Sequence, residues 1–198
     1  MKKALSIILG IVFLLISGTN GFAAALEWKV DPAHSGIYFG ISHIYSTVKG
    51  FFSEFSGVIE FDPANLKESR FDFTVNVNSI NTNNGKRDGH LQSADFFDAG
   101  KFPKMTFKST TISHTGGDQY SVEGTLTVKD VSKNIKLPFT FFGFKQHPLN
   151  PKQQVAGFET RLDIDRLEYH VGDGKFYQMG AVGKEVNVLV SVEATRDK

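Results

Sequence analysis

Apolar and polar residues alternate with a period of two through most of this chain. The pattern is clearest at 70–77, where Phe71, Phe73, Val75 and Val77 alternate with charged or polar residues. Side chains of a β-strand point in turn to opposite faces of the sheet, so each such segment predicts a strand with one apolar and one polar face. No long amphipathic helical pattern accompanies these strands, so we expect an all-β fold.

About eight or nine antiparallel strands follow from this pattern. They are expected at 27–30, 35–44, 47–61, 70–77, 105–111, 120–128, 135–141, 158–164 and 186–192. The long segment 47–61 is expected as one strand with a bulge near 50–53, because the adjacent Phe51 and Phe52 break the alternation. Pro138 cannot donate to a strand ladder, so it indicates a bulge or a sheet edge.

Strands with one apolar face, and no helix to cover them, can bury that face in a sandwich or in a closed barrel. A barrel of about eight strands either fills its lumen with side chains or holds one ligand. Gly57, Ser109, Gly124 and Thr160 at inward positions leave room among the aromatic residues, which favours an antiparallel barrel with a cavity. The alternative is that the same aromatic residues form a solid core. The residues expected to line the barrel are Ile37, Phe39, Ile41, Phe55, Phe73, Val75, Phe107, Leu126, Phe139, Phe141, Phe158 and Val188.

The segment from Asn83 to Pro103 lies in the one long interruption of the strand pattern. Asn83 or Asn84 can cap a short helix in this segment, because an asparagine side chain accepts a hydrogen bond from the free backbone N–H groups of a helix start. Phe96 and Phe97 follow among polar residues, and two adjacent large aromatic side chains would be costly if left in water. We expect both to fold inward.

The first 25 residues have the pattern of a secretory signal peptide. Lys2 and Lys3 precede an apolar run at 4–16, and small residues lead to Ala23 and Ala25. We therefore expect cleavage after Ala25 and a soluble, periplasmic mature chain that forms a single domain over 26–198. The apolar run is too short to span a membrane as a helix.

Charge and cysteine content exclude several classes of function. The chain has 22 Lys and Arg against 21 Asp and Glu, and no Lys/Arg cluster. It is therefore not expected to bind nucleic acid, whose phosphates require a basic face. It has no cysteine, which excludes disulfides, thiol catalysis and thiolate metal sites.

Four segments of the chain carry a recognisable signature. The most specific is the segment from Arg87 to Pro103, which fits the pattern RDxHLxSxDFFDxxxxP. The other blocks read WKVDPAHSGIYFGISH, GFFSEFSGVIEFDP and YSVEGTLTVKDVSKNIKLP. Together these segments resemble the YceI-like family, and the resemblance extends over essentially the whole mature chain. The resemblance weakens after about Gln146, so the choice of ligand is expected to differ from that of relatives.

The resemblance implies an extended, lipocalin-like antiparallel β-barrel that is exported to the periplasm. It also implies that the lumen binds, transports or stores a polyisoprenoid, a quinone-like lipid or another long-chain fatty amphiphile. No cofactor other than that lipid is expected. Transient contact with a membrane and pairing into a homodimer are compatible with such a role.

Histidine and aspartate residues offer an alternative reading as a metal-dependent or hydrolytic enzyme. His34, His43, Asp88 and His90 could in principle form a metal or hydrolytic site, yet no pair has the spacing of a ligand motif such as HExxH. The simpler interpretation is that these residues and Arg87 hold the central loop to the barrel or contact a polar lipid head. Nucleophile and phosphate-loop motifs are missing too, so we expect no bound metal and no enzyme activity.

Overall fold

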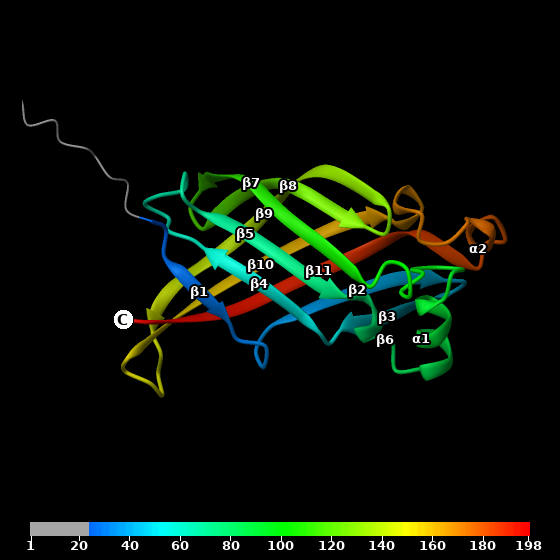
Figure 1. Ribbon diagram of the computed structural model, residues 1–198, viewed down its shortest axis with the longest axis horizontal. Helices are drawn as coiled ribbons and strands as arrows, with labels where there is room; N and C mark the ends of the chain where they lie inside the picture. Colours follow the sequence, from blue (N-terminus) through cyan, green and yellow to red (C-terminus); the bar gives the residue numbers. More distant parts are fainter. Residues whose placement is uncertain (1–23) are drawn as a thin grey trace, which may run out of the picture.

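The computed structural model describes residues 24–198 as one long β-barrel with two short helices (Figure 1). The predicted signal peptide lies almost wholly outside the described residues. Neither helix within 24–198 is long and apolar enough to cross a membrane. The elements are β1 (Glu27–Val30), β2 (Gly36–His43), β3 (Ser46–Phe52), β4 (Phe55–Glu60), β5 (Arg70–Asn76), η1 (Val77–Ser79), β6 (Ile80–Asn81), α1 (Gly85–Gln92), β7 (Lys104–Gly116), β8 (Gln119–Val128), β9 (Val131–Gln146), β10 (Gln153–Asp165), η2 (Arg166–Tyr169), α2 (Lys175–Gln178) and β11 (Val182–Asp197).

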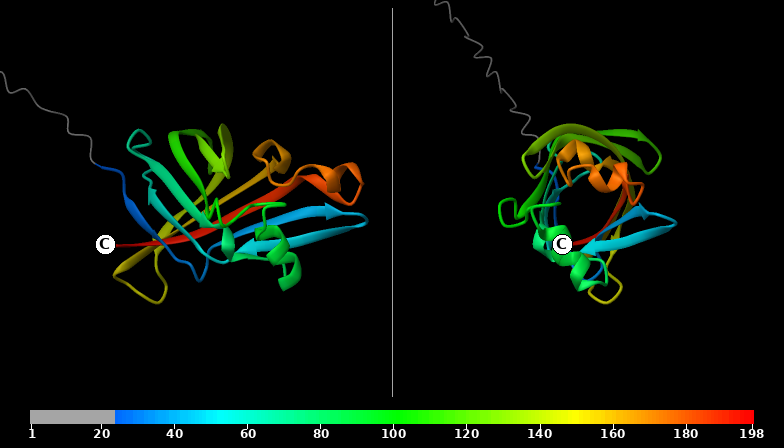
Figure 2. Two further views of the ribbon diagram at one scale, coloured as in Figure 1. Left: turned by 45° about the vertical axis from the view of Figure 1, so that its right-hand side comes forward. Right: turned by 90° about the vertical axis from the view of Figure 1, so that its right-hand side faces the viewer.

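Eight antiparallel strands close the barrel in the order β1-β4-β5-β7-β8-β9-β10-β11, and β1 pairs with β11 to complete the ring. The right-hand view of Figure 2 looks down the axis of the barrel and shows this ring end on. Strand β11 is long enough to pair with β1 near its end, at Thr195, and with β2 over Val182 to Ser191. The β2–β3 hairpin therefore continues the wall on the same edge of β11. The predicted all-β, lipocalin-like barrel is confirmed.

The segment 47–61 is two strands, so the prediction of one bulged strand was wrong. Strand β3 pairs with β2 in unbroken register, whereas β4 pairs with β1 and β5. Between them the backbone N–H groups of Ser53 and Glu54 donate to the carbonyl and hydroxyl oxygens of Ser79. This change of partner, and not a bulge, accounts for the break in alternation at Phe51 and Phe52.

Pro138 lies at a sheet edge, as its missing N–H indicated. The ladder between β9 and β10 runs from Gln146 and Gln154 only as far as Thr140 and Glu159. Beyond it the Thr160 hydroxyl donates to the Pro138 carbonyl at 2.6 Å. One wall of the barrel therefore opens along the first half of β9.

The short helix expected in the central segment is α1. Asn84 caps it, because its side chain accepts a hydrogen bond from the N–H of Arg87. The chain that follows turns Phe96 into a buried position against Tyr169 and Val171, and Phe97 packs partly buried beside it. The inward folding of these two rings is confirmed.

An aromatic plug fills the end of the barrel that is remote from α1 and α2. We use this name for Phe61 and the five rings whose centroids lie 4.9–5.9 Å from it. Phe61 is 1% exposed, and its carbonyl accepts a hydrogen bond from the Trp28 indole at 3.0 Å. Most of these ring pairs meet edge to face, which is a favoured aromatic geometry. The five rings are Phe71, Tyr120, Phe139, Phe141 and Phe158.

Replacing Phe61 with alanine is expected to lower the free energy of unfolding by about 3 to 5 kcal/mol, the usual cost of removing a well-packed phenylalanine. Phe107→Ala is the matched control, because Phe107 is only half-buried and faces a cavity. It should cost clearly less, since part of that space is already empty. Urea denaturation of the two variants measures the difference. Equal losses would contradict the separation of a packed plug from a hollow lumen.

Candidate functional site

A cavity of about 580 Å³ occupies the barrel between the aromatic plug and the two helices. Its size is within the range of about 300 to 1,000 Å³ that is usual for small-molecule sites. The wall consists of inward side chains from alternate strand positions, and nearly all of them are aliphatic or aromatic. Such a surface favours a long apolar molecule over a polar one.

Ten of the twelve residues predicted to line the barrel do line this cavity. The other two lie elsewhere: Phe141 is inside the aromatic plug, and Phe55 packs on a smaller core cluster with Phe52 and Ile80. The ten lining residues are Ile37, Phe39, Ile41, Phe73, Val75, Phe107, Leu126, Phe139, Phe158 and Val188.

The floor of the cavity is the inner surface of the aromatic plug. Phe71, Phe139 and Phe158 belong to the plug and also line the cavity. Phe139 and Phe158 are 5% and 7% exposed, so they are packed as core residues and present only one side to the empty space. The cavity is therefore closed at this end by rings that already have aromatic partners.

The opposite end is formed by α1, α2 and the tip of the β2–β3 hairpin. His43 and Met179 line the cavity there although both are exposed, so the cavity reaches the surface at this end, which we call the mouth. The Ile44 N–H donates to the Ala181 carbonyl at 3.0 Å and joins the hairpin tip to the chain after α2.

Arg87 and Asp88 hold α1 to the barrel wall through Thr82. The Thr82 backbone N–H and hydroxyl donate to the Asp88 carboxylate, while the Arg87 guanidinium donates to the Thr82 hydroxyl and carbonyl oxygens. Thr82 directly follows β6, which pairs with β3. These bonds fix the position of α1 at the mouth, where Arg87 and His90 line the cavity.

The four residues of the alternative enzyme reading do not form one cluster. Asp88 bonds Thr82, the His90 Nε2 atom lies 3.0 Å from an Asp95 oxygen, and His34 is on the β1–β2 connection. Within 24–198, the one group of three side chains that could share a metal ion is a different one: Asp31, His34 and Glu193.

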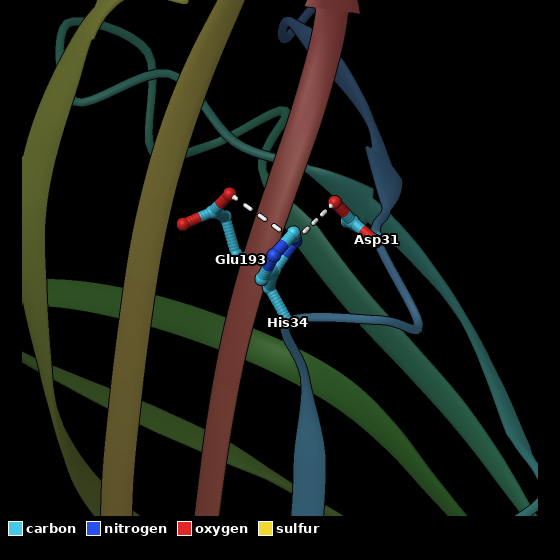
Figure 3. A group of neighbouring side chains, drawn as sticks. All are labelled: Asp31, His34 and Glu193. Atoms are coloured by element: carbon cyan, nitrogen blue, oxygen red, sulfur yellow. Dashed lines mark hydrogen bonds and ion pairs between the residues drawn. The ribbon is translucent and has the colours of Figure 1, made fainter.

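Asp31, His34 and Glu193 form an ion-pair group in which His34 is exposed and the two carboxylates are half-buried (Figure 3). None of the three lines the cavity. The His34 Nδ1 atom lies 2.8 Å from an Asp31 oxygen and 3.9 Å from a Glu193 oxygen. The hydrogen bond to Asp31 raises the pKa of His34, and the same bond lowers the pKa of Asp31. The group joins the β1–β2 turn to β11, a structural task that needs no ion.

Arg166 is a polar residue of the cavity wall that the sequence analysis did not select. It begins η2 directly after β10, lines the cavity and is 5% exposed. Its Nε donates to the Gly183 carbonyl at 2.9 Å and its Nη1 to the Val171 carbonyl at 2.6 Å. Burial lowers the pKa of Arg166, against the opposing effect of Asp165 and Asp173. The available sequence signal was an arginine placed directly after an alternating apolar strand.

Comparisons with known proteins agree with this architecture. The family described as the YceI-like domain matches residues 28–194. Protein YceI of Salmonella agona is 35% identical over 201 residues, which cover all of both chains.

Solved structures show the same barrel. The crystal structure of Burkholderia cenocepacia BcnA is similar with a TM-score of 0.74 and 28% identity, over 83% of this chain and 99% of that one. The Campylobacter jejuni YCEI protein gives a TM-score of 0.67 and 33% identity, over 77% and 87% of the two chains. A polyisoprenoid binding domain from Saccharophagus degradans gives 0.62 at 17% identity, over 84% and 97%, and supports the fold alone. With a domain match over nearly all of the described residues and a full-length relative above 30% identity, this chain belongs to the YceI-like family.

Proposed function

We propose that this protein binds a polyisoprenoid or a similar long-chain amphiphile in its barrel and carries or stores it in the periplasm. The observation that carries the proposal is the cavity of about 580 Å³ with an almost wholly apolar wall. The relative from Saccharophagus degradans, described as a polyisoprenoid binding domain, supports the same ligand class. The role requires no chemistry on the ligand, and we expect none.

The driving force is the removal of the lipid tail from water. Each buried CH₂ contributes about 0.8 kcal/mol, while association and ordering of the flexible tail cost several kcal/mol. A tail of several isoprene units can therefore reach sub-micromolar affinity without any covalent bond. The affinity should rise with tail length until the cavity is full.

Protein purified from its native compartment is expected to carry about one long-chain lipid per chain. Organic extraction followed by mass spectrometry identifies and counts it. Leu126→Trp should reduce the amount of bound lipid or select lipids with shorter tails. Leu126 lines the cavity beside Phe107 of the neighbouring strand, and a tryptophan there would fill part of the cavity. Lys108→Trp, on the outer face of the neighbouring strand, is the matched control and should carry the same lipid as the unchanged protein. An extract without lipid, from protein that also fails to bind added prenyl chains, would refute the function.

A periplasmic carrier must be exported, and we propose that residues 1–25 serve as the cleaved signal. The intact mass of protein recovered from the periplasm is expected to correspond to a chain that begins at Leu26. A chain that begins before Gly21, or one that stays in the membrane fraction, would contradict the proposed soluble carrier.

We propose further that the mouth touches a membrane transiently, through a rim formed by Ile44, Tyr45, Tyr177 and Met179. Ile44 and Tyr45 are 62% and 101% exposed at the tip of the β2–β3 hairpin. Ile44 has a φ of +50°, a backbone conformation that is costly for a β-branched residue and that glycine or asparagine adopts readily. The fold thus retains a strained, exposed apolar residue at the mouth, where contact with a bilayer would bury it.

The shape of the rim favours a bilayer over a protein partner. It consists of four side chains on a narrow hairpin tip and at the end of α2, whereas a stable protein interface buries about 800 Å² on each side. Tyrosine, like tryptophan, is enriched at membrane–water interfaces, and isoleucine and methionine add apolar area. A lipid that enters through the mouth would then pass from the bilayer to the cavity without crossing water. Pairing into a homodimer remains a separate prediction.

The double variant Ile44→Asn/Tyr45→Ser is expected to reduce binding to phosphatidylethanolamine–phosphatidylglycerol vesicles about tenfold, since it removes the apolar side chains of the tip. Its stability should be unchanged or higher, because asparagine tolerates a positive φ. Leu149→Asn is the control: Leu149 is 89% exposed in the β9–β10 loop at the opposite end of the barrel (Figure 1). Vesicle co-sedimentation measures the binding. Similar losses of vesicle binding in both variants would contradict membrane contact through the mouth.

A further inference from the structure

Arg166 is a nearly buried cation with one nitrogen that has no hydrogen-bond partner. Its Nε and Nη1 atoms bond the carbonyls of Gly183 and Val171, but its Nη2 atom has no partner among the described residues. A guanidinium carries five N–H donors, and leaving buried donors unpaired is costly. The hydrogen bonds to Gly183 and Val171 explain how Arg166 is oriented, but they do not explain why Nη2 is left without a partner.

Arg166 takes part in none of the ion pairs within 24–198. The Asp165 and Asp173 carboxylates act on its charge only from a distance, and both have other partners. Asp165 pairs with Lys184 at 2.9 Å and accepts from the Leu167 N–H, while Asp173 accepts from the Lys175 N–H. A buried charge without its counter-charge is strongly destabilising. An anion brought by a ligand would supply the missing partner.

Most ionisable side chains of the cavity wall are basic. Besides Arg166, the ionisable cationic or basic residues of the described wall are Arg87, His43 and His90. The one carboxylate on the wall is Glu159, which is bonded to Arg161 at 3.2 Å. The cavity therefore combines an apolar tail channel with basic groups and offers no unpaired carboxylate to repel an anion.

The surroundings of Arg166 belong to the helical end of the cavity. The guanidinium carbon lies 5.8 Å from the centroid of the Phe96 ring, and that ring stacks on Phe176 of α2. His90 of α1 meets Phe96 edge to face at 5.1 Å. A head group beside Arg166 would thus lie near the mouth, with its tail directed toward the aromatic plug.

We propose that Arg166 binds the anionic head, a carboxylate or a phosphate, of the long-chain amphiphile that occupies the cavity. The inference rests on the lipid-binding function proposed above and narrows it to acidic lipids. Nη2 is buried, so binding would require a small shift of the wall beside it, after which Nη2 would donate to a head-group oxygen. The bonds to Gly183 and Val171 hold the rest of the guanidinium in place. Neutral alcohols and esters with the same tail would lack the charge that Arg166 requires.

The test compares ligands that differ only in the head group, on delipidated protein at pH 7.5. Palmitate is paired with its methyl ester, and farnesyl phosphate with farnesol; displacement of a fluorescent lipid probe gives the affinities. At least one acidic ligand is expected to bind about tenfold to a hundredfold more tightly than its neutral partner, as a charge-assisted hydrogen bond would give. The pair with the larger ratio tells whether carboxylate or phosphate fits.

Arg166→Gln should remove this preference while the neutral ligands keep their affinity. Arg70→Gln is the control, because Arg70 is an exposed residue that pairs with Glu60 and does not line the cavity, and it should keep the preference. If Arg166→Gln does not fold, the test is the ratio of acidic to neutral ligand affinities measured on the unchanged protein. Neutral ligands that bind as tightly as their acids, or a folded Arg166→Gln that keeps the preference, would overturn the inference. Failure of all four ligands would overturn the lipid-binding function together with it.

Discussion

The packing of five aromatic rings around Phe61 is the interaction on which the rest of the barrel depends. A closed ring of strands must bury its inward side chains against something, and a solid core would leave no space for a ligand. Here the tight packing is concentrated at one end, where Phe61 contacts five rings. That concentration allows the rest of the lumen to hold a cavity of about 580 Å³.

The opposite end is held by polar contacts and by a smaller apolar cluster around Phe96, because helices and loops meet there instead of strands. Thr82 connects α1 to the wall through Arg87 and Asp88, and Arg166 connects η2 to β11 through the Gly183 carbonyl. These contacts are directional and few, whereas the plug is held by many apolar contacts. Opening of the barrel at the helices therefore disrupts less packing than opening at the plug, which suits an end through which a ligand enters.

The sequence predicted which face of each strand points inward, but not how far along the barrel a residue lies. Alternation places Phe139 and Phe141 on the same face, and both do point inward. Both belong to the plug, but only Phe139 also lines the cavity. Phe141 lies two residues further along β9, against Phe61. The break at Ser53 was missed for a related reason: local alternation does not show that β3 and β4 pair with different strands. Both features depend on contacts between segments distant in sequence.

Arg166 shows why a binding residue can escape sequence reasoning in a fold of this kind. On the sequence it is one of 22 Lys and Arg residues in a chain of nearly balanced charge, and it follows a strand as many exposed arginines do. Arg166 stands out only in the structure, where its side chain is 5% exposed. The adjacent carboxylate, Asp165, forms its ion pair with Lys184 and not with Arg166. A structural arginine would be satisfied by carbonyls on every side. This one retains an unpaired donor beside an apolar cavity, so its environment is completed by whatever acidic group the ligand provides.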